Sequence, residues 1–185
     1  LSFGGTWGMV EFGATDDVID NTAVGGQDTQ AHGGGFDGNF GTFYTQRGSA
    51  GVLGTTGSTG DANKIAYYTP DFSGLSGAVS FTPSVGESFQ SGGPVSNNNE
   101  NVIETAVQYG TSFDAVDLAL SAGYRHGDAE DGTSGSELED VSQWRVGATV
   151  GLAGFTLGAG YGDNGDANCT SGTRCDAGEN WNIGL

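Results

Sequence analysis

Short and long connections alternate without exception between the strand-like segments of this sequence. Apolar residues recur at every second position in residues 103–110, 116–125, 141–152 and 155–162, the pattern of a half-buried β-strand. Tight turns are expected at 5–8, 71–73, 112–114 and 153–154. Long polar segments at 16–63, 84–100, 127–139 and 163–179 separate them. This order predicts an up-and-down antiparallel sheet in which every strand crosses one layer.

Each predicted strand has one apolar face and one face of small, polar or charged residues. In 141–152, for example, Trp144, Val146 and Val150 alternate with Gln143 and Arg145. Strands of this kind, with short turns on one side and longer loops on the other, are typical of outer-membrane barrels. Greek-key connections in a soluble sandwich do not force loop lengths to alternate. We therefore expect an all-β, transmembrane, antiparallel up-and-down β-barrel.

Aromatic residues lie near both ends of the predicted strands. Trp7, Phe72 and Phe113 are in or beside the short turns, and Tyr124 and Trp144 lie toward the long loops. Aromatic girdles at the two membrane surfaces would have this arrangement. The alternative is ordinary packing at the ends of a sheet.

Composition excludes several other classes of protein. The 36 glycines among 185 residues disfavour a helical bundle, since each costs about 1 kcal/mol in a helix. A net charge of −18 gives nucleic acid no basic surface to bind. The sequence has no run of 18 apolar residues, so it predicts no transmembrane helix.

The strand count predicts an internal fragment of a longer barrel. Seven strands are expected between the ends, with partial strands at 1–4 and 180–185. An open sheet edge in lipid leaves unpaired backbone groups at several kcal/mol each, so a barrel must close. We expect the chain to be one domain, 1–185, with strand hairpins at 1–15, 64–83, 101–126, 140–162 and 180–185.

Two segments match a known pattern. Residues 1–13, L-S-F-G-G-T-W-G-M-V-E-F-G, are similar to a hairpin G-L-x-G-x-F-G-x-V-x-x-G-R, and residues 63–77 are similar to N-S-[VI]-x-Y-x-S-P-x-F-x-G-F. The chain thus resembles the general porins of Gram-negative bacteria, although Ala14 replaces an arginine and Leu185 a terminal aromatic residue. The resemblance implies a porin-like, sixteen-stranded, trimeric barrel of the outer membrane, with eight to nine strands represented here.

The resemblance also implies that the connection at 16–63 folds into the barrel and narrows it. The acidic residues expected at this constriction are Asp16, Asp17, Asp20, Asp28 and Asp37. The basic residues expected on the pore wall are Lys64, Arg125 and Arg145. Opposed charges would set up a transverse field, and the net charge would favour cations. Alternatively, each base pairs with a carboxylate such as Asp117 or Glu104.

Cys169 and Cys175 lie six positions apart, and in an oxidising compartment we expect them to form a disulfide; the alternative is a free pair. Acidic residues crowd the loop before residue 141. The candidate ligands are Asp128, Glu130 and Asp131, and Glu137, Glu139 and Asp140 lie in the same loop. Such oxygens can hold Ca²⁺ or Mg²⁺ and bridge to lipopolysaccharide phosphates, whereas most acidic runs are simply solvated. No other cofactor is expected.

The function predicted is a water-filled channel for passive diffusion of small hydrophilic solutes and ions. Its expected partners are two further copies of itself, outer-membrane lipid and lipopolysaccharide, and small polar solutes. The chain has two histidines, and no triad or phosphate loop is recognisable, so we do not expect an enzyme. A secreted or surface-exposed all-β adhesion or calcium-binding module is the alternative, and a barrel lipase or protease is a third hypothesis.

Overall fold

The computed structural model describes residues 1–29, 59–86, 99–129, 137–167, 169–172 and 178–185. In this part of the chain two short helices accompany one nine-stranded sheet. The strands are β1 (Ser2–Gly5), β2 (Gly8–Ala14), β3 (Asn63–Tyr68), β4 (Leu75–Ser84), β5 (Asn99–Phe113), β6 (Val116–Ala129), β7 (Val141–Leu152), β8 (Phe155–Asp163) and β9 (Glu179–Gly184). The helices are α1 (Val18–Thr22) and the 3₁₀ helix η1 (Gly26–Thr29).

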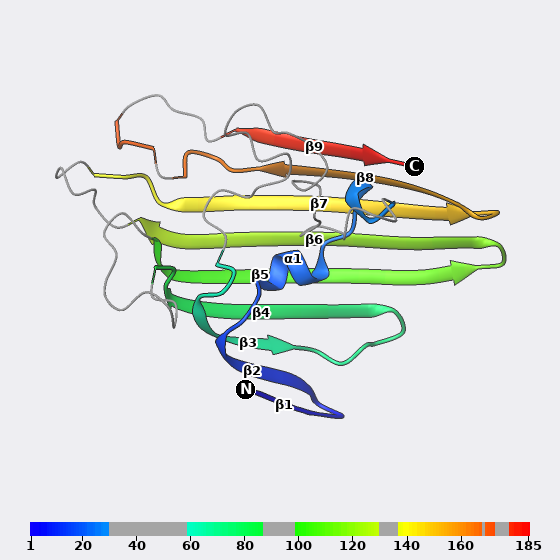
Figure 1. The fold of residues 1–185 in the computed structure, drawn as a ribbon, viewed down its shortest axis with the longest axis horizontal. Coiled ribbons are helices and arrows are strands. Elements are labelled where there is room, and N and C mark those ends of the chain that lie inside the picture. The colour runs from blue at the N-terminus through cyan, green and yellow to red at the C-terminus, as the bar shows by residue number, and fades with distance from the viewer. Residues whose placement is uncertain (30–58, 87–98, 130–136, 168, 173–177) are drawn as a thin grey trace.

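Every strand pairs antiparallel with the next strand along the chain, in the order β1 to β9. The all-β, up-and-down antiparallel prediction is therefore confirmed. The four tight turns lie at one end of the sheet, and the strand ends that lead into the longer connections lie at the other (Figure 1). At 153–154 both Ala153 (φ 52°) and Gly154 (φ 85°) are left-handed, as a two-residue type I′ hairpin requires.

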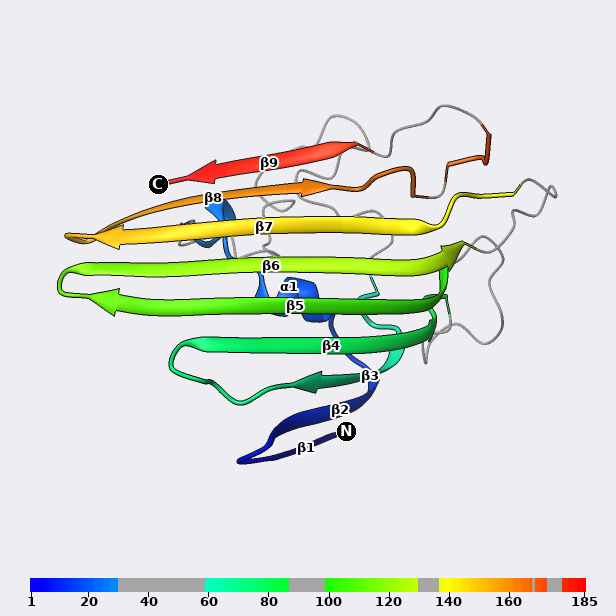
Figure 2. The same ribbon diagram turned by 180° about the vertical axis from the view of Figure 1, so that it is seen from behind.

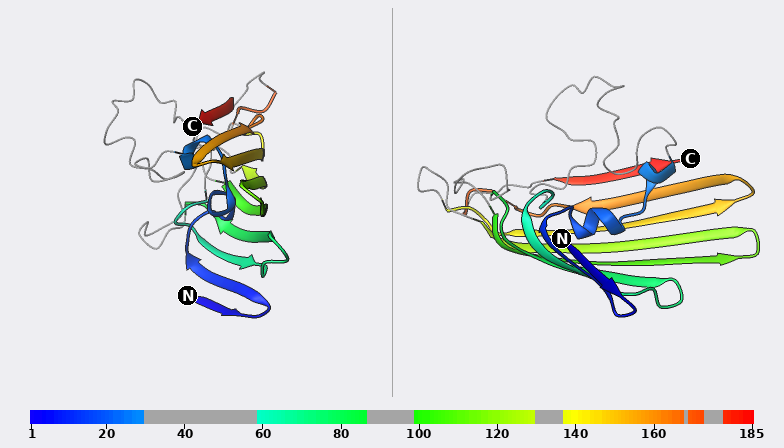
Figure 3. Two further views of the ribbon diagram at one scale, coloured as in Figure 1. Left: turned by 90° about the vertical axis from the view of Figure 1, so that its right-hand side faces the viewer. Right: turned by 60° about the horizontal axis from the view of Figure 1, so that its bottom comes forward.

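The sheet is curved, and the two helices lie on its concave face (Figure 3). α1 contacts β4, β5 and β6, and η1 contacts β8 and β9, so the chain leaving β2 crosses most of the sheet. From behind, no described helix covers the strands (Figure 2). Among the described residues, none of the helices has the length and apolar character that a membrane crossing requires.

The convex face is apolar and exposed. Its large exposed side chains include Phe12, Ile65, Val79, Phe81, Ile103, Val107, Leu120, Tyr124, Trp144, Val146, Val150, Leu152, Leu157 and Ile183. From Trp144 to Leu152, at the tight turn, the strand covers about 26 Å at the usual rise per residue. Because the strands of a transmembrane barrel are tilted by about 35–45°, this length covers about 20 Å of an apolar band that is about 25 Å tall.

Aromatic contacts mark both ends of this band. At the tight turns the rings of Trp7 and Tyr67 stack with centroids 6.4 Å apart. Toward the long connections Trp144 packs on Tyr161 at 5.3 Å, and the Tyr124 hydroxyl shares a hydrogen bond with Ser142. Amphipathic rings of this type favour the level of the lipid headgroups.

The buried apolar cluster is small and lies on the concave face. Val18 and Ile19 of α1 pack there on Ala66, Ala78 and Ala106 of the sheet. Small wall residues let α1 approach the strands, because alanine keeps the inner surface nearly flat. The large exposed apolar side chains of the strands are therefore on the convex face, and the apolar cluster on the concave face lies beneath α1.

Candidate channel wall and the segment bound to it

α1 begins at Val18 because Asp17 caps it. Oδ1 of Asp17 accepts hydrogen bonds from the backbone nitrogens of Ile19 (2.8 Å) and Asp20 (3.3 Å). An N-cap carboxylate satisfies donors that the first helical turn leaves free. With one oxygen used for the cap, the Oδ2 atom of Asp17 is directed at the sheet.

Arg125 on β6 receives that oxygen. Its Nη2 donates to Asp17 Oδ2, its Nε donates to Glu104 Oε1 at 2.7 Å, and its Nη1 donates to Gln143 Oε1 at 2.9 Å. All four side chains are buried, and Arg125 and Glu104 are 0% exposed. A guanidinium presents its donors in a fixed fork, which suits it to hold three acceptors at once.

Thr59 lies at the end of the connection between β2 and β3 and contacts both Glu104 and Lys64. Its hydroxyl donates to Glu104 Oε2 at 2.8 Å, and the hydroxyl of Ser80 donates to the same oxygen at 2.9 Å. Lys64 Nζ donates to the carbonyl (2.6 Å) and hydroxyl (2.9 Å) of Thr59 and to the carbonyl of Thr15 (2.9 Å).

We call this set the buried polar cluster. Its members are Asp17, Thr59, Lys64, Ser80, Glu104, Arg125 and Gln143. Two carboxylates balance two cations, and the hydrogen bonds given above use every ionised group. Both ends of the connection between β2 and β3, at Asp17 and at Thr59, are therefore bound to the same place on the wall.

The third predicted wall base, Arg145, lies on β7 and pairs with Asp20 of α1. Nη1 of Arg145 is 2.9 Å from Oδ1 of Asp20, and both side chains are 13% exposed. Thus all three predicted wall bases are on the concave face, where Lys64 and Arg125 are buried and Arg145 is in an ion pair. The sequence-based alternative, a base paired with Glu104, describes Arg125.

The predicted acidic residues separate in the same way. Asp16 is exposed, Asp17 is buried in the cluster, and Asp20 pairs with Arg145. Asp28 lies in η1, but its side chain is outside the described structure. Asp37 lies outside the described residues.

Beyond α1 the chain crosses the wall to the start of η1. The Val24 nitrogen donates to Ser121 Oγ on β6 at 3.0 Å, and the Gly26 nitrogen donates to Asn182 Oδ1 on β9 at 2.6 Å. We call residues 23–26 the crossing segment. Gly25 and Gly26 are buried against β8 and β9.

Several of these residues were not predicted as site residues, namely Thr59, Ser121, Gln143 and Asn182. The inward orientation of Ser121, Gln143 and Asn182 follows from strand alternation, so that signal was present, whereas Thr59 precedes β3 and lies on no strand. That these residues bind one segment depends on where residues 23–26 and Thr59 lie in space. The alternation of side chains along a strand carries no information on that.

The predicted disulfide and metal residues lie at the long connections. Cys169 is buried and disulfide-bonded, and Cys175 lies outside the described residues, so their pairing stays a prediction. Asp128 accepts a hydrogen bond from Asn101 Nδ2 at 3.0 Å.

The other acidic residues of this region differ in whether the structure describes them. Glu130 and Asp131 are outside the described residues, whereas Glu137, Glu139 and Asp140 are within them. Within the described ranges no group of three or more His, Cys, Asp or Glu side chains could hold a metal ion. A Ca²⁺ site in this region stays a prediction.

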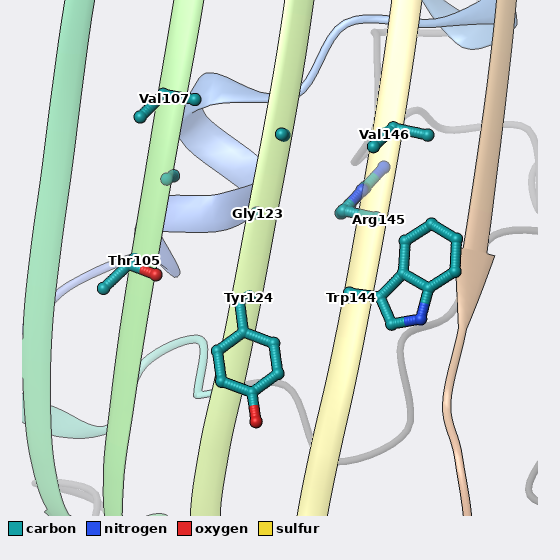
Figure 4. Close-up of a pocket in the computed structure, with 9 residues that line it drawn as sticks. Thr105, Val107, Gly123, Tyr124, Trp144, Arg145 and Val146 are labelled. Carbon is teal, nitrogen blue, oxygen red and sulfur yellow. The ribbon is translucent and has the colours of Figure 1, made fainter.

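The convex face carries a shallow apolar recess of about 290 Å³ over β5, β6 and β7. Figure 4 shows Tyr124, Trp144 and Val146 around it, while the side chain of Arg145 points to the other face. The apolar character of this recess suits the convex face to contact with lipid.

A curved antiparallel wall, apolar outside and polar inside, with a loop segment bound across its inner face, is the architecture of an outer-membrane β-barrel channel. The chain belongs to the family of Gram-negative porins, whose sequence profile matches residues 1–185. It is accordingly a protein of the bacterial outer membrane, in a family of channels. No curated protein matches the chain.

Proposed function

We propose that this porin allows passive diffusion of small hydrophilic solutes and ions, that it prefers cations, and that it works as a homotrimer without catalytic activity. The observation that carries the proposal is the inward segment 15–29. It lies on the concave face of the sheet and is bound there by the buried polar cluster and by Ser121 and Asn182. A fixed segment inside a barrel narrows the channel, and selection by diameter and wall charge then follows.

The cation preference is supported by the charges on the described part of the wall. Its three bases, Lys64, Arg125 and Arg145, are occupied by carboxylate or carbonyl partners. Asp16 remains exposed next to α1. A narrow mouth with net negative charge concentrates cations, because low-dielectric walls focus the field.

The test is single-channel recording of the protein in planar bilayers, with reversal potentials under a salt gradient. We expect open channels and a reversal potential on the cation side. Asp16→Asn should reduce the cation preference. The matched control is Asp114→Asn, which removes an exposed carboxylate from the tight turn between β5 and β6, where asparagine tolerates the same left-handed backbone (φ 53°).

Bilayers that stay silent with correctly folded protein would overturn the diffusion channel. Anion selectivity, or equal effects of the two substitutions, would overturn the role given to Asp16. The trimer rests on family membership, and light scattering of the detergent-solubilised protein decides it: a mass of one protomer contradicts the proposal.

A further inference from the structure

We propose that three wall glycines act as a seat that sets how far the crossing segment stands from the sheet, and so determine the pore radius on this side. They are Gly147 on β7, Gly158 on β8 and Gly184 on β9, and we call them the glycine seat. The inference rests on the proposed function, since it concerns the dimension of the same channel.

The contacts of the glycine seat are with backbone atoms. A Cβ at Gly147 would collide with the carbonyl group of Val24, whose carbon would lie at 2.9 Å. At Gly158 it would meet the carbonyl carbon of Gly25 at 2.7 Å and the Cα of Gly26 at 3.0 Å. Backbone atoms cannot rotate aside as a side chain does, so the crossing segment itself would have to move.

Contacts at Gly184 extend the seat to the last strand. A Cβ there would collide with the carbonyl group of Gly26 and the hydroxyl of Thr29. Gly26 fits equally closely from the other side, since its own Cβ would lie 2.6 Å from the carbonyl carbon of Ile183. Gly26 and Gly184 thus both lack a side chain at the point where the two backbones meet.

Other inward glycines differ from the glycine seat. A Cβ at Gly110 on β5 would have no atom within 4 Å, and one at Gly123 would meet only the side chain of Ile19. Glycine weakens a strand interior, and a close backbone approach is a usual reason for it. Gly147 and Gly158 have such an approach, and Gly110 has none.

Hydrogen bonds fix the crossing segment on both sides of the contact. Val24 is bound to Ser121 on β6, before Gly147, and Gly26 is bound to Asn182 on β9, after Gly158. A methyl group added beneath a segment fixed at both sides moves it away from the wall. In a barrel that direction is into the channel.

The experiment compares Gly147→Ala and Gly158→Ala with Gly110→Ala as the matched control. Single-channel conductance is recorded with and without neutral polymers of graded size, which gives a size cut-off. We expect lower conductance and a smaller cut-off in the first two variants, and wild-type values in the control. Wild-type values in Gly147→Ala, or a larger cut-off, would overturn the proposal.

Two further measurements keep the test decisive. Ser121→Ala adds no atom to the wall and should retain the fold. It removes the hydrogen bond that holds Val24, so the size cut-off should change. A wild-type size cut-off in this variant also counts against the glycine seat. Hydrogen exchange of the amides of residues 23–26 is measured without recording a channel current, so it does not depend on the protein conducting. It should quicken in Gly147→Ala and not in Gly110→Ala, and unchanged exchange overturns the inference even if the wild type fails to conduct.

Discussion

Removing the guanidinium of Arg125 should release the inward segment from the wall. In Arg125→Met the carboxylates of Asp17 and Glu104 stay buried but lose the guanidinium, which in the wild type lies 2.7 Å from Glu104 Oε1. The amide oxygen of Gln143 loses its hydrogen-bond donor as well. Breaking a buried ion pair by removing one partner typically costs about 3–5 kcal/mol. The side chain of methionine fills much of the volume but replaces no hydrogen bond.

The opposing term is the packing of α1. Val18 and Ile19 are buried, and burial of each such side chain contributes about 1.5–3 kcal/mol. The penalty in Arg125→Met is of the same size as this gain, so α1 should leave the wall while the strands stay paired. The loss appears as local release of the segment and as a reduced free energy of unfolding.

The assays are limited proteolysis and hydrogen exchange of residues 15–29, with urea unfolding of the protein in lipid vesicles. The control is Arg145→Met, whose pair with Asp20 is more accessible to water, with both side chains 13% exposed, so a smaller loss is expected. The double variant Asp17→Asn, Arg125→Met leaves one carboxylate, Glu104, to balance the one remaining cation, Lys64, and keeps a capping side chain at position 17, so it should recover part of the loss. Equal stability of Arg125→Met and Arg145→Met would refute the reasoning.

Three further predictions concern lipid contact, loop packing and redox state. Leu120→Lys on the convex face should lower the free energy of unfolding by about 2–4 kcal/mol in vesicles, and Ala119→Lys on the concave face much less, since a lysine near the bilayer midplane loses its hydration. Ile19→Ala should lower the free energy of detaching α1 by about 2–4 kcal/mol in hydrogen exchange, and the graded control Ile19→Val, which removes one methylene group, by about 0.5–1.5 kcal/mol. Without reductant, mass spectrometry should find neither Cys169 nor Cys175 alkylated, and modification of Cys169 would contradict the disulfide.

Strand existence, strand faces and strand order followed from local rules. Period-two alternation assigned the residues of β6 and β7 to two faces, and connection length ordered the strands up and down. A tight turn also fixes register. Glu104 and Arg125 lie equally far from the turn at 114–115, and they are direct neighbours in the sheet. The turn expected from the sequence, 112–114, differs from the observed one and would not pair these two residues, so the existence of a tight turn was predictable and the exact register was not.

The position of Gln143 beside Arg125 could not be obtained in this way. Their register is set across a connection of eleven residues between β6 and β7, and such a length permits several alignments. The same holds for Thr59, which reaches Glu104 only because the long connection returns to the point where it left the wall.

The sequence by itself determined that this protein is an antiparallel sheet with a lipid-facing side and a lumen-facing side, because side-chain alternation is a property of each strand alone. Only the tertiary structure decided which lumenal charges stay accessible. Arg125 and Asp16 both have the pattern of pore residues, yet the first is buried beneath α1 and the second is exposed. The difference arises because α1 packs over Arg125, whereas Asp16 precedes the helix and keeps its side chain exposed; where α1 packs depends on contacts between residues distant in the chain.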